Sequence, residues 1–156
     1  MNFRKGGDIM SKLTNKTDKS DKSFQKGLRV ITVASVIIAL VSWIFNLGWY
    51  RVFLTWIPIP FAYTIAFLII NFKVIKRALE FTHLRKYILL SNATYLLSYL
   101  LFPDGGDIGG MYVFFGLIKN SIVAGIAMYA ALILFVATVV ILILECIALK
   151  ECKELS

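Results

Sequence analysis

Four long apolar runs dominate this chain of 156 residues. None contains a charged residue, and short polar breaks separate them: 30–50, 52–72, 87–102 and 120–144. A helix rises about 1.5 Å per residue and the hydrocarbon core of a bilayer is about 30 Å thick, so each run is close to one membrane crossing. The pattern predicts an all-α, polytopic membrane protein, an antiparallel bundle of four transmembrane helices at about 30–50, 52–76, 86–102 and 120–147.

Composition leaves little room for a separate water-soluble domain. The chain is 59% hydrophobic and 17% charged, whereas soluble domains are roughly 45–50% apolar and 25% charged. We expect one transmembrane domain over residues 28–149, with an outer loop at 103–119. The polar, basic tail at 1–27 is predicted to be disordered, and 150–156 form a short second tail.

Positive charge is sorted along the chain. The tail, the three breaks and the C-terminal end carry 8, 1, 5, 1 and 2 Lys/Arg in turn, which accounts for all 17. Because basic residues concentrate in cytoplasmic segments, this alternation predicts a protein integral to the cell membrane, with both termini cytoplasmic. The expected partners are the lipid bilayer and anionic headgroups near the basic tail. Sorted in this way, the net charge of +8 does not indicate nucleic-acid binding.

Polar residues in the third run follow a helical period and form one broad face. They are Ser91, Asn92, Thr94, Tyr95, Ser98 and Tyr99. Since an unpaired hydroxyl or amide in lipid is costly, this face should turn toward the other helices. Two interpretations stay open: hydrogen bonding between helices, or the polar wall of a small-solute path.

The second run contains Pro58 and Pro60, which predict a bent or irregular outer third of that helix. The loop after the third run carries Asp104 and Asp107 among four glycines. These residues fit a plain turn, a partner-binding or gating loop, or a hard-cation site, although two carboxylates are few for calcium. A short outer helix is expected over 111–119.

The fourth run shows pairs of small residues four apart, Ser121 with Gly125 and Ala127 with Ala131. Such pairs allow helices to approach closely, either within the chain or in a homo-oligomer. Glu145 follows the run, and near the cytoplasmic end we expect it to reach headgroups or water.

No catalytic set is visible. The chain has one histidine, His83, two cysteines that are not spaced as C-x-x-C, and no nucleotide-binding glycine motif. We therefore predict no catalytic residue, metal site or cofactor, and no enzyme. The leading hypothesis is an accessory, scaffold or immunity-like protein that acts through helix and outer-loop contacts with a protein partner. The alternative is an oligomeric transporter or channel subunit for small solutes or ions, which uses the polar face of the third run. An enzyme using Asp104, Asp107 or His83 ranks third.

Overall fold

The computed structural model describes residues 4–45, 49–79, 81–105 and 110–154, and the side chains of residues 4–21, 49, 50, 55 and 153 lie outside that description. The prediction of an all-α protein is confirmed: the chain is 81% helical, and its described part contains no strand. The helices are α1 (Arg4–Phe45), α2 (Trp49–Thr55), α3 (Ile59–Ile75), α4 (Thr82–Leu101) and α5 (Ser121–Glu154).

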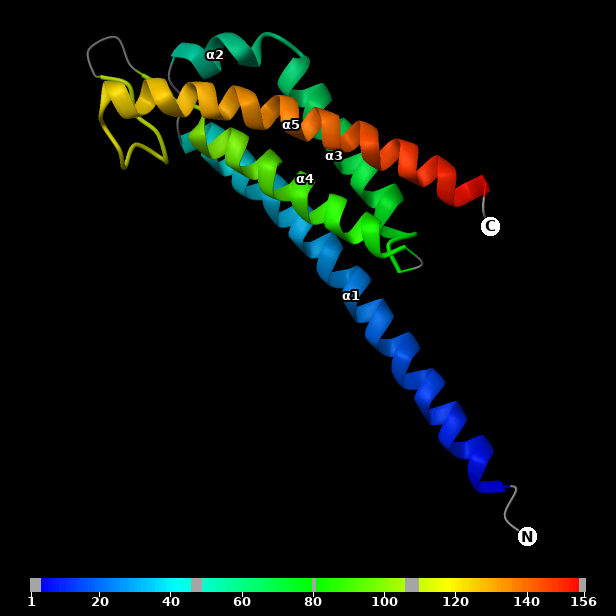
Figure 1. Cartoon of the computed structure of the whole chain (residues 1–156). Coiled ribbons are helices and arrows are strands. Elements are labelled where there is room, and N and C mark those ends of the chain that lie inside the picture. The colour runs from blue at the N-terminus through cyan, green and yellow to red at the C-terminus, as the bar shows by residue number, and fades with distance from the viewer. Residues whose placement is uncertain (1–3, 46–48, 80, 106–109, 155–156) are drawn as a thin grey trace.

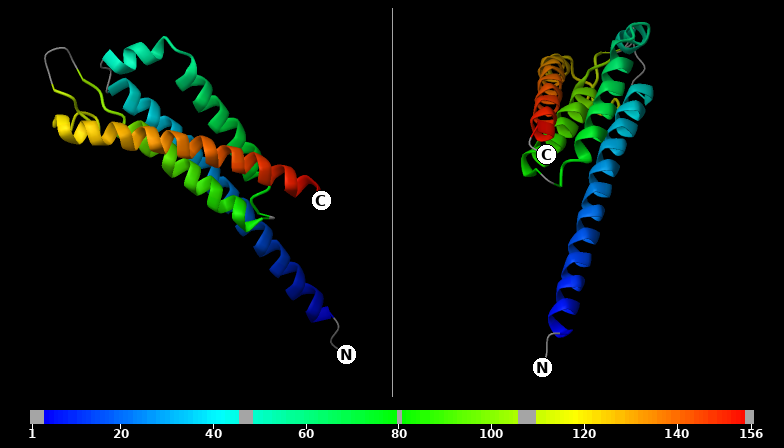
Figure 2. Two further views of the ribbon diagram at one scale, coloured as in Figure 1. Left: turned by 45° about the horizontal axis from the view of Figure 1, so that its top comes forward. Right: turned by 90° about the vertical axis from the view of Figure 1, so that its right-hand side faces the viewer.

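Four of these helices, α1, α3, α4 and α5, run side by side in alternating directions (Figure 1). α4 contacts each of the other three, and it lies between α5 and α1 when the molecule is viewed from the side (Figure 2, right). We call the end that holds α2 and residues 102–105 and 110–120 the loop end. The opposite end, with the α3–α4 connection and the end of α5, is called the tail end.

Local sequence explains where the helices begin and end. Pro58 precedes α3 and Pro60 lies in its first turn, where a missing N–H is tolerated. The single helix expected at 52–76 is therefore two helices, α2 and α3, joined by a turn. Asn120 starts α5, because its side-chain oxygen accepts hydrogen bonds from the backbone N–H groups of Ile122 and Val123 at 2.9 and 3.2 Å.

The first helix is longer than expected. α1 begins at Arg4 and therefore includes tail residues for which the sequence predicts disorder. That part of α1 projects away from the other helices (Figure 1). An isolated helical segment has little tertiary support, since most helical stability in proteins comes from packing.

The segment 111–119 differs from the short outer helix predicted there. Val113 and Ile118 pair through two backbone hydrogen bonds, and the turn between them has positive φ angles at Phe114, Phe115 and Gly116. A helix needs negative φ angles throughout, so this segment forms a tight turn instead. Val113 is buried against Ala124 and Ala127 of α5, which attaches the turn to the bundle.

The core consists of three apolar clusters along the bundle. The tail-end cluster includes Leu28, Val74, Leu84, Ile88 and Ala148, the middle one Val36, Phe67, Tyr95 and Leu142, and the loop-end one Val113, Ala124 and Ala127. Large apolar side chains are also exposed along the outward faces of the helices, among them Ile37, Ile65, Ile126, Ile133 and Val140.

Two helical spans in the described part of the chain are long and apolar enough to cross a membrane, Lys22–Phe45 and Ser121–Cys152. The most apolar windows of these spans are only 33% and 28% buried, whereas the core helix of a soluble protein is mostly buried. Ile59–Ile75 is apolar but shorter.

Candidate functional site

The predicted polar face of α4 points into the molecule. Five of its six residues are buried, namely Ser91, Asn92, Thr94, Tyr95 and Ser98, and Tyr99 is half-buried. Several of their partners on α1, α3 and α5 are buried as well, among them Thr32, Asn71, Thr138 and Glu145. Polar groups gather at three places, one at each end of these helices and one between the ends.

The grouping toward the tail end contains a carboxyl group. Thr32, Asn71, Ser91, Asn92 and Glu145, which we call the Glu145 cluster, come from all four long helices and are at most 3% exposed. The Ser91 hydroxyl lies 2.8 Å from Glu145 Oε1 and 3.3 Å from Asn71 Oδ1. The Asn92 amide nitrogen lies 3.3 Å from both Asn71 Oδ1 and Thr32 Oγ1.

The position of Glu145 corrects the sequence prediction. Glu145 was expected to reach headgroups or water, but its side chain is 0% exposed. α5 continues to Glu154, so Glu145 lies more than two turns before the end of that helix and faces α4. Glu145 is one of three charged side chains that are fully buried among the described residues, together with Arg51 and Asp104.

Between the two ends, tyrosine side chains fill the bundle. Tyr95 stacks on Phe67 with ring centroids 4.0 Å apart. The Thr64 hydroxyl lies 3.0 Å from the Tyr95 hydroxyl and 3.1 Å from that of Tyr99. Tyr99 also donates to the carbonyl of Pro60, which accepts from the Thr64 hydroxyl as well.

The remaining residues of the α4 face bond locally or to one neighbour. Thr138 of α5 donates to the Thr94 hydroxyl at 2.8 Å, and Ser98 donates to the carbonyl of Tyr95. These contacts use the hydroxyl groups within the interhelical interface. The Thr138–Thr94 bond thus links α5 to α4, whereas the bond of Ser98 lies within α4.

At the loop end, a buried arginine joins four segments. Arg51 of α2 is 0% exposed and donates to the carbonyl of Ser42, and at 3.2 and 2.7 Å to those of Tyr99 and Phe102. Its Nε lies 3.5 Å from Asp104 Oδ2. We call these five residues the Arg51 clamp, and it connects the ends of α1 and α4 to α2 and the following loop.

Electrostatics keep the clamp charged. Burial lowers the pKa of Arg51 to about 10, and the carboxylate of Asp104 opposes that shift. The guanidinium is therefore protonated at neutral pH. The Asp104 carboxylate provides the counter-charge for this buried guanidinium, and three carbonyl oxygens accept its hydrogen bonds.

Of the two predicted outer-loop site residues, the structure describes Asp104. Asp104 is 0% exposed, pairs with Arg51, and forms a two-way backbone pair with Tyr112. Asp107 lies outside the described residues. Within the described part of the chain no group of three or more His, Cys, Asp or Glu could hold a metal ion. His83 is exposed at the tail end, so Asp104 and His83 lie at opposite ends of the molecule.

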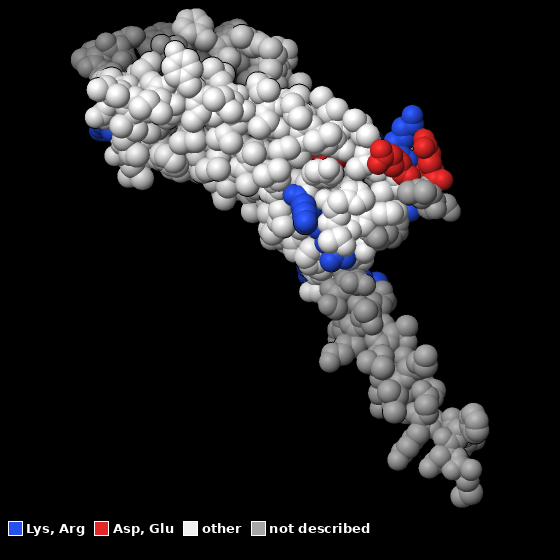
Figure 3. Space-filling model, viewed as in Figure 1, with Lys and Arg blue, Asp and Glu red and all other residues white. Residues whose placement is uncertain are grey.

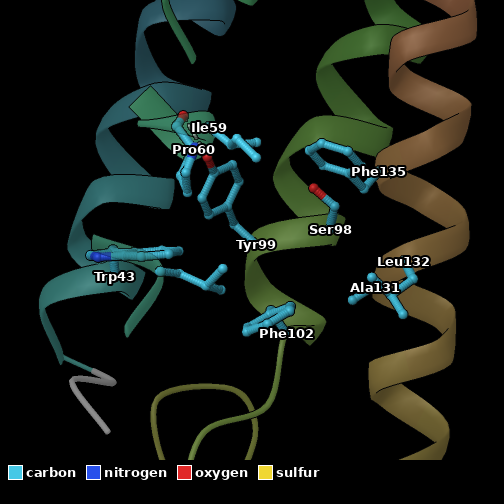
Figure 4. Close-up of a pocket in the computed structure, with 10 residues that line it drawn as sticks. Trp43, Ile59, Pro60, Ser98, Tyr99, Phe102, Ala131, Leu132 and Phe135 are labelled. Atoms are coloured by element: carbon cyan, nitrogen blue, oxygen red, sulfur yellow. Dashed lines mark hydrogen bonds between the residues drawn. The ribbon is translucent and has the colours of Figure 1, made fainter. Parts of the chain in front are cut away.

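An apolar cavity of about 180 Å³ lies beside the clamp (Figure 4). Side chains of all five helices, and of Phe102 just after α4, converge on it: Trp43, Leu54, Ile59, Pro60, Ser98, Tyr99, Phe102, Ala131, Leu132 and Phe135. Trp43, which lines this cavity, also lies against the Arg51 guanidinium, and the Arg51 Cζ atom is 5.4 Å from the centroid of the Trp43 ring.

Sequence reasoning missed Arg51, Asn71 and the burial of Glu145. Two signals were present. The first is charge: Arg51 is the one charged residue between the first two runs, and Asp104 has the opposite charge in a loop predicted at the same end. The second is Asn71, the one amide side chain within the second apolar run. An amide in such a run needs a partner on another helix.

Comparison of the chain with protein-family models, curated proteins and solved structures finds no match.

Proposed function

We propose that α1, α3, α4 and α5 cross a bilayer as an antiparallel bundle with both termini on the cytoplasmic side. Large apolar side chains exposed along these helices support this placement, because soluble proteins rarely expose apolar surfaces of this extent. Charged side chains gather at the tail end, and the surface of the helices between the two ends is almost free of them in this view (Figure 3).

Within that bilayer, the proposed role is that of an accessory or scaffold protein that acts through helix faces and its outer turn. One observation carries the proposal: the polar side chains of α4 are bonded inside the bundle, which leaves apolar faces and the turn 113–118 for contact with a partner. Leu117 in this turn is 81% exposed although it is apolar. We do not propose catalysis, since His83 and Asp104 lie too far apart to act together.

Site-specific photocrosslinking in native membranes tests this role. A photoreactive residue at Leu117, or at the exposed Ile133 of α5, is expected to give an adduct with one reproducible protein partner. The same residue at Glu151, which is exposed at the tail end, serves as the control for collisional adducts. Lipid adducts alone at both Leu117 and Ile133 would contradict the accessory role.

A second candidate is an oligomeric transporter or channel subunit for a small solute or ion, and the Glu145 cluster favours it. An acid buried in a membrane helix is costly and often belongs to an ion or proton pathway. Alanine replacement of Asn92, Tyr95 and Tyr99 separates the two candidates. Lost solute flux at unchanged membrane abundance supports transport, whereas reduced abundance alone supports a packing role.

A further inference from the structure

The Glu145 cluster contains more hydrogen-bond acceptors than donors. The single hydroxyl hydrogen of Ser91 faces three acceptors, namely Glu145 Oε1, Asn71 Oδ1 and the carbonyl of Ile88. In the described part of the chain, Glu145 Oε2 and Asn92 Oδ1 are buried without a hydrogen-bond partner. Unsatisfied buried polar atoms are rare in native proteins and call for an explanation.

The orientation of the two amides is fixed by their neighbours. The Asn92 nitrogen faces the carbonyl of Ile88 at 2.7 Å and the oxygens of Asn71 and Thr32, so a flipped amide would place oxygen against oxygen. The Asn71 nitrogen donates to the carbonyl of Phe67 at 3.1 Å. Both amide oxygens are therefore acceptors, and neither amide has a second orientation that supplies the missing donor.

Charge is unbalanced in the same way. Ser91 is the hydrogen-bond partner of Glu145 among the described residues, and a hydroxyl group carries no charge to neutralise a carboxylate. A buried carboxylate requires a positive partner, as the Arg51 clamp provides for Asp104. What the cluster lacks is a single positive charge that several oxygen atoms can share.

We propose that the Glu145 cluster binds a monovalent metal cation of the sodium type. The ligands are the Glu145 carboxylate, Asn71 Oδ1, Asn92 Oδ1 and the Ser91 hydroxyl oxygen. One carboxylate neutralises one positive charge, whereas a divalent ion would leave a net charge buried in an apolar bundle. An all-oxygen donor set selects a hard cation over a soft transition metal.

Such a site joins all four long helices at one point. Asn71 belongs to α3, Ser91 and Asn92 to α4, and Glu145 to α5, while Thr32 of α1 contacts the Asn92 amide. The bound ion stabilises the assembled bundle, because it binds the folded arrangement and not the separated helices. The inference depends on neither candidate function, since binding is measured on the purified chain.

The test uses the full chain purified in detergent, with sodium ion as the probe. Radioactive sodium binding and the thermal unfolding midpoint are measured at fixed pH and ionic strength, with choline replacing sodium. We expect saturable binding and a midpoint that rises with sodium. Glu145→Gln should weaken binding by more than about tenfold, while the matched variant Glu151→Gln, exposed on the same helix, binds as the wild type does.

The wild-type chain alone can overturn the proposal. Absence of saturable sodium binding would do so, and so would a midpoint that responds to pH through Glu145 but not to sodium, the signature of a site for a proton only. If Glu145→Gln does not fold, Asn92→Ala replaces it, and sodium affinity equal to that of the wild type in this variant contradicts the ligand set.

Discussion

The two ends of the molecule surround a buried carboxylate with different groups. At the loop end, Asp104 faces the guanidinium of Arg51, which also meets three backbone carbonyls. Near the tail end, Glu145 faces one hydroxyl and a group of acceptor oxygens. The first arrangement pairs two opposite charges, whereas no positively charged partner of Glu145 is found among the described residues. We therefore regard the Arg51 clamp as a structural pair and the Glu145 cluster as the proposed cation site.

Breaking the clamp should have the largest effect. Arg51→Ala leaves Asp104 buried without its cation, and removing one partner of a buried pair costs about 3–5 kcal/mol. We expect a loss of this size in the free energy of unfolding, measured by denaturant titration in detergent micelles. The double variant Arg51→Met/Asp104→Leu should recover much of it, because two apolar side chains leave no charge buried. A double variant less stable than Arg51→Ala would contradict the assignment of the pair.

Neutralising Glu145, the other buried carboxylate, should raise the free energy of unfolding instead of lowering it. Glu145→Gln removes an uncompensated charge and adds an N–H donor to an acceptor-rich cluster, so without sodium it should stabilise the chain by about 2 kcal/mol. High sodium should reduce that difference, because the ion stabilises only the wild type. Unfolding titrations with and without sodium measure this difference in stability between the variant and the wild type. Equal stability of Glu145→Gln and wild type under both conditions would show that Glu145 is already neutral.

A substitution in the tyrosine region between the two ends should change the free energy of unfolding less. Thr64→Val removes the hydroxyl that lies between those of Tyr95 and Tyr99 but keeps the shape of the side chain. Tyr99 keeps its bond to the carbonyl of Pro60, so we expect a loss of about 1 kcal/mol in the free energy of unfolding. Sodium affinity should not change. A change in that affinity would mean that the tyrosine region and the Glu145 cluster form one network.

The smallest effect concerns the small-residue pairs of α5. An added methyl at Gly125 meets nothing within 4 Å in the chain, whereas Ala127 and Ala131 are buried. Gly125→Ala should therefore raise the free energy of unfolding by about 0.5 kcal/mol, the gain expected for alanine in a helix. Crosslinking before and after the substitution reports the oligomeric state. If Gly125→Ala disrupts an oligomer, the Ser121/Gly125 pair lies at a homo-oligomer interface.

Sequence alone located the features that depend on one segment. Apolar length and proline positions predicted long helices with an irregular region near Pro58, and the spacing of polar residues predicted the inward face of α4. Features that join distant segments could not be predicted from the sequence. The Arg51–Asp104 pair depends on α2 lying beside the loop that follows α4, and the burial of Glu145 depends on how far α5 continues and which way it faces. The turn 113–118 was missed because positive φ angles at Phe114 and Phe115 carry no residue signature, since glycine is the usual indicator.

In the proposed placement, lipid surrounds the helices, the loop end lies outside the cell and the tail end lies inside. Cysteine labelling in intact cells tests this most directly, in a background without Cys146 and Cys152. Leu117→Cys is exposed in the outer turn and Ser23→Cys is exposed near the start of the bundle. A membrane-impermeant maleimide should react with Leu117→Cys in intact cells and with Ser23→Cys only after permeabilisation. Labelling of Ser23→Cys from outside, or recovery of the folded chain from aqueous extract without detergent, would contradict the account.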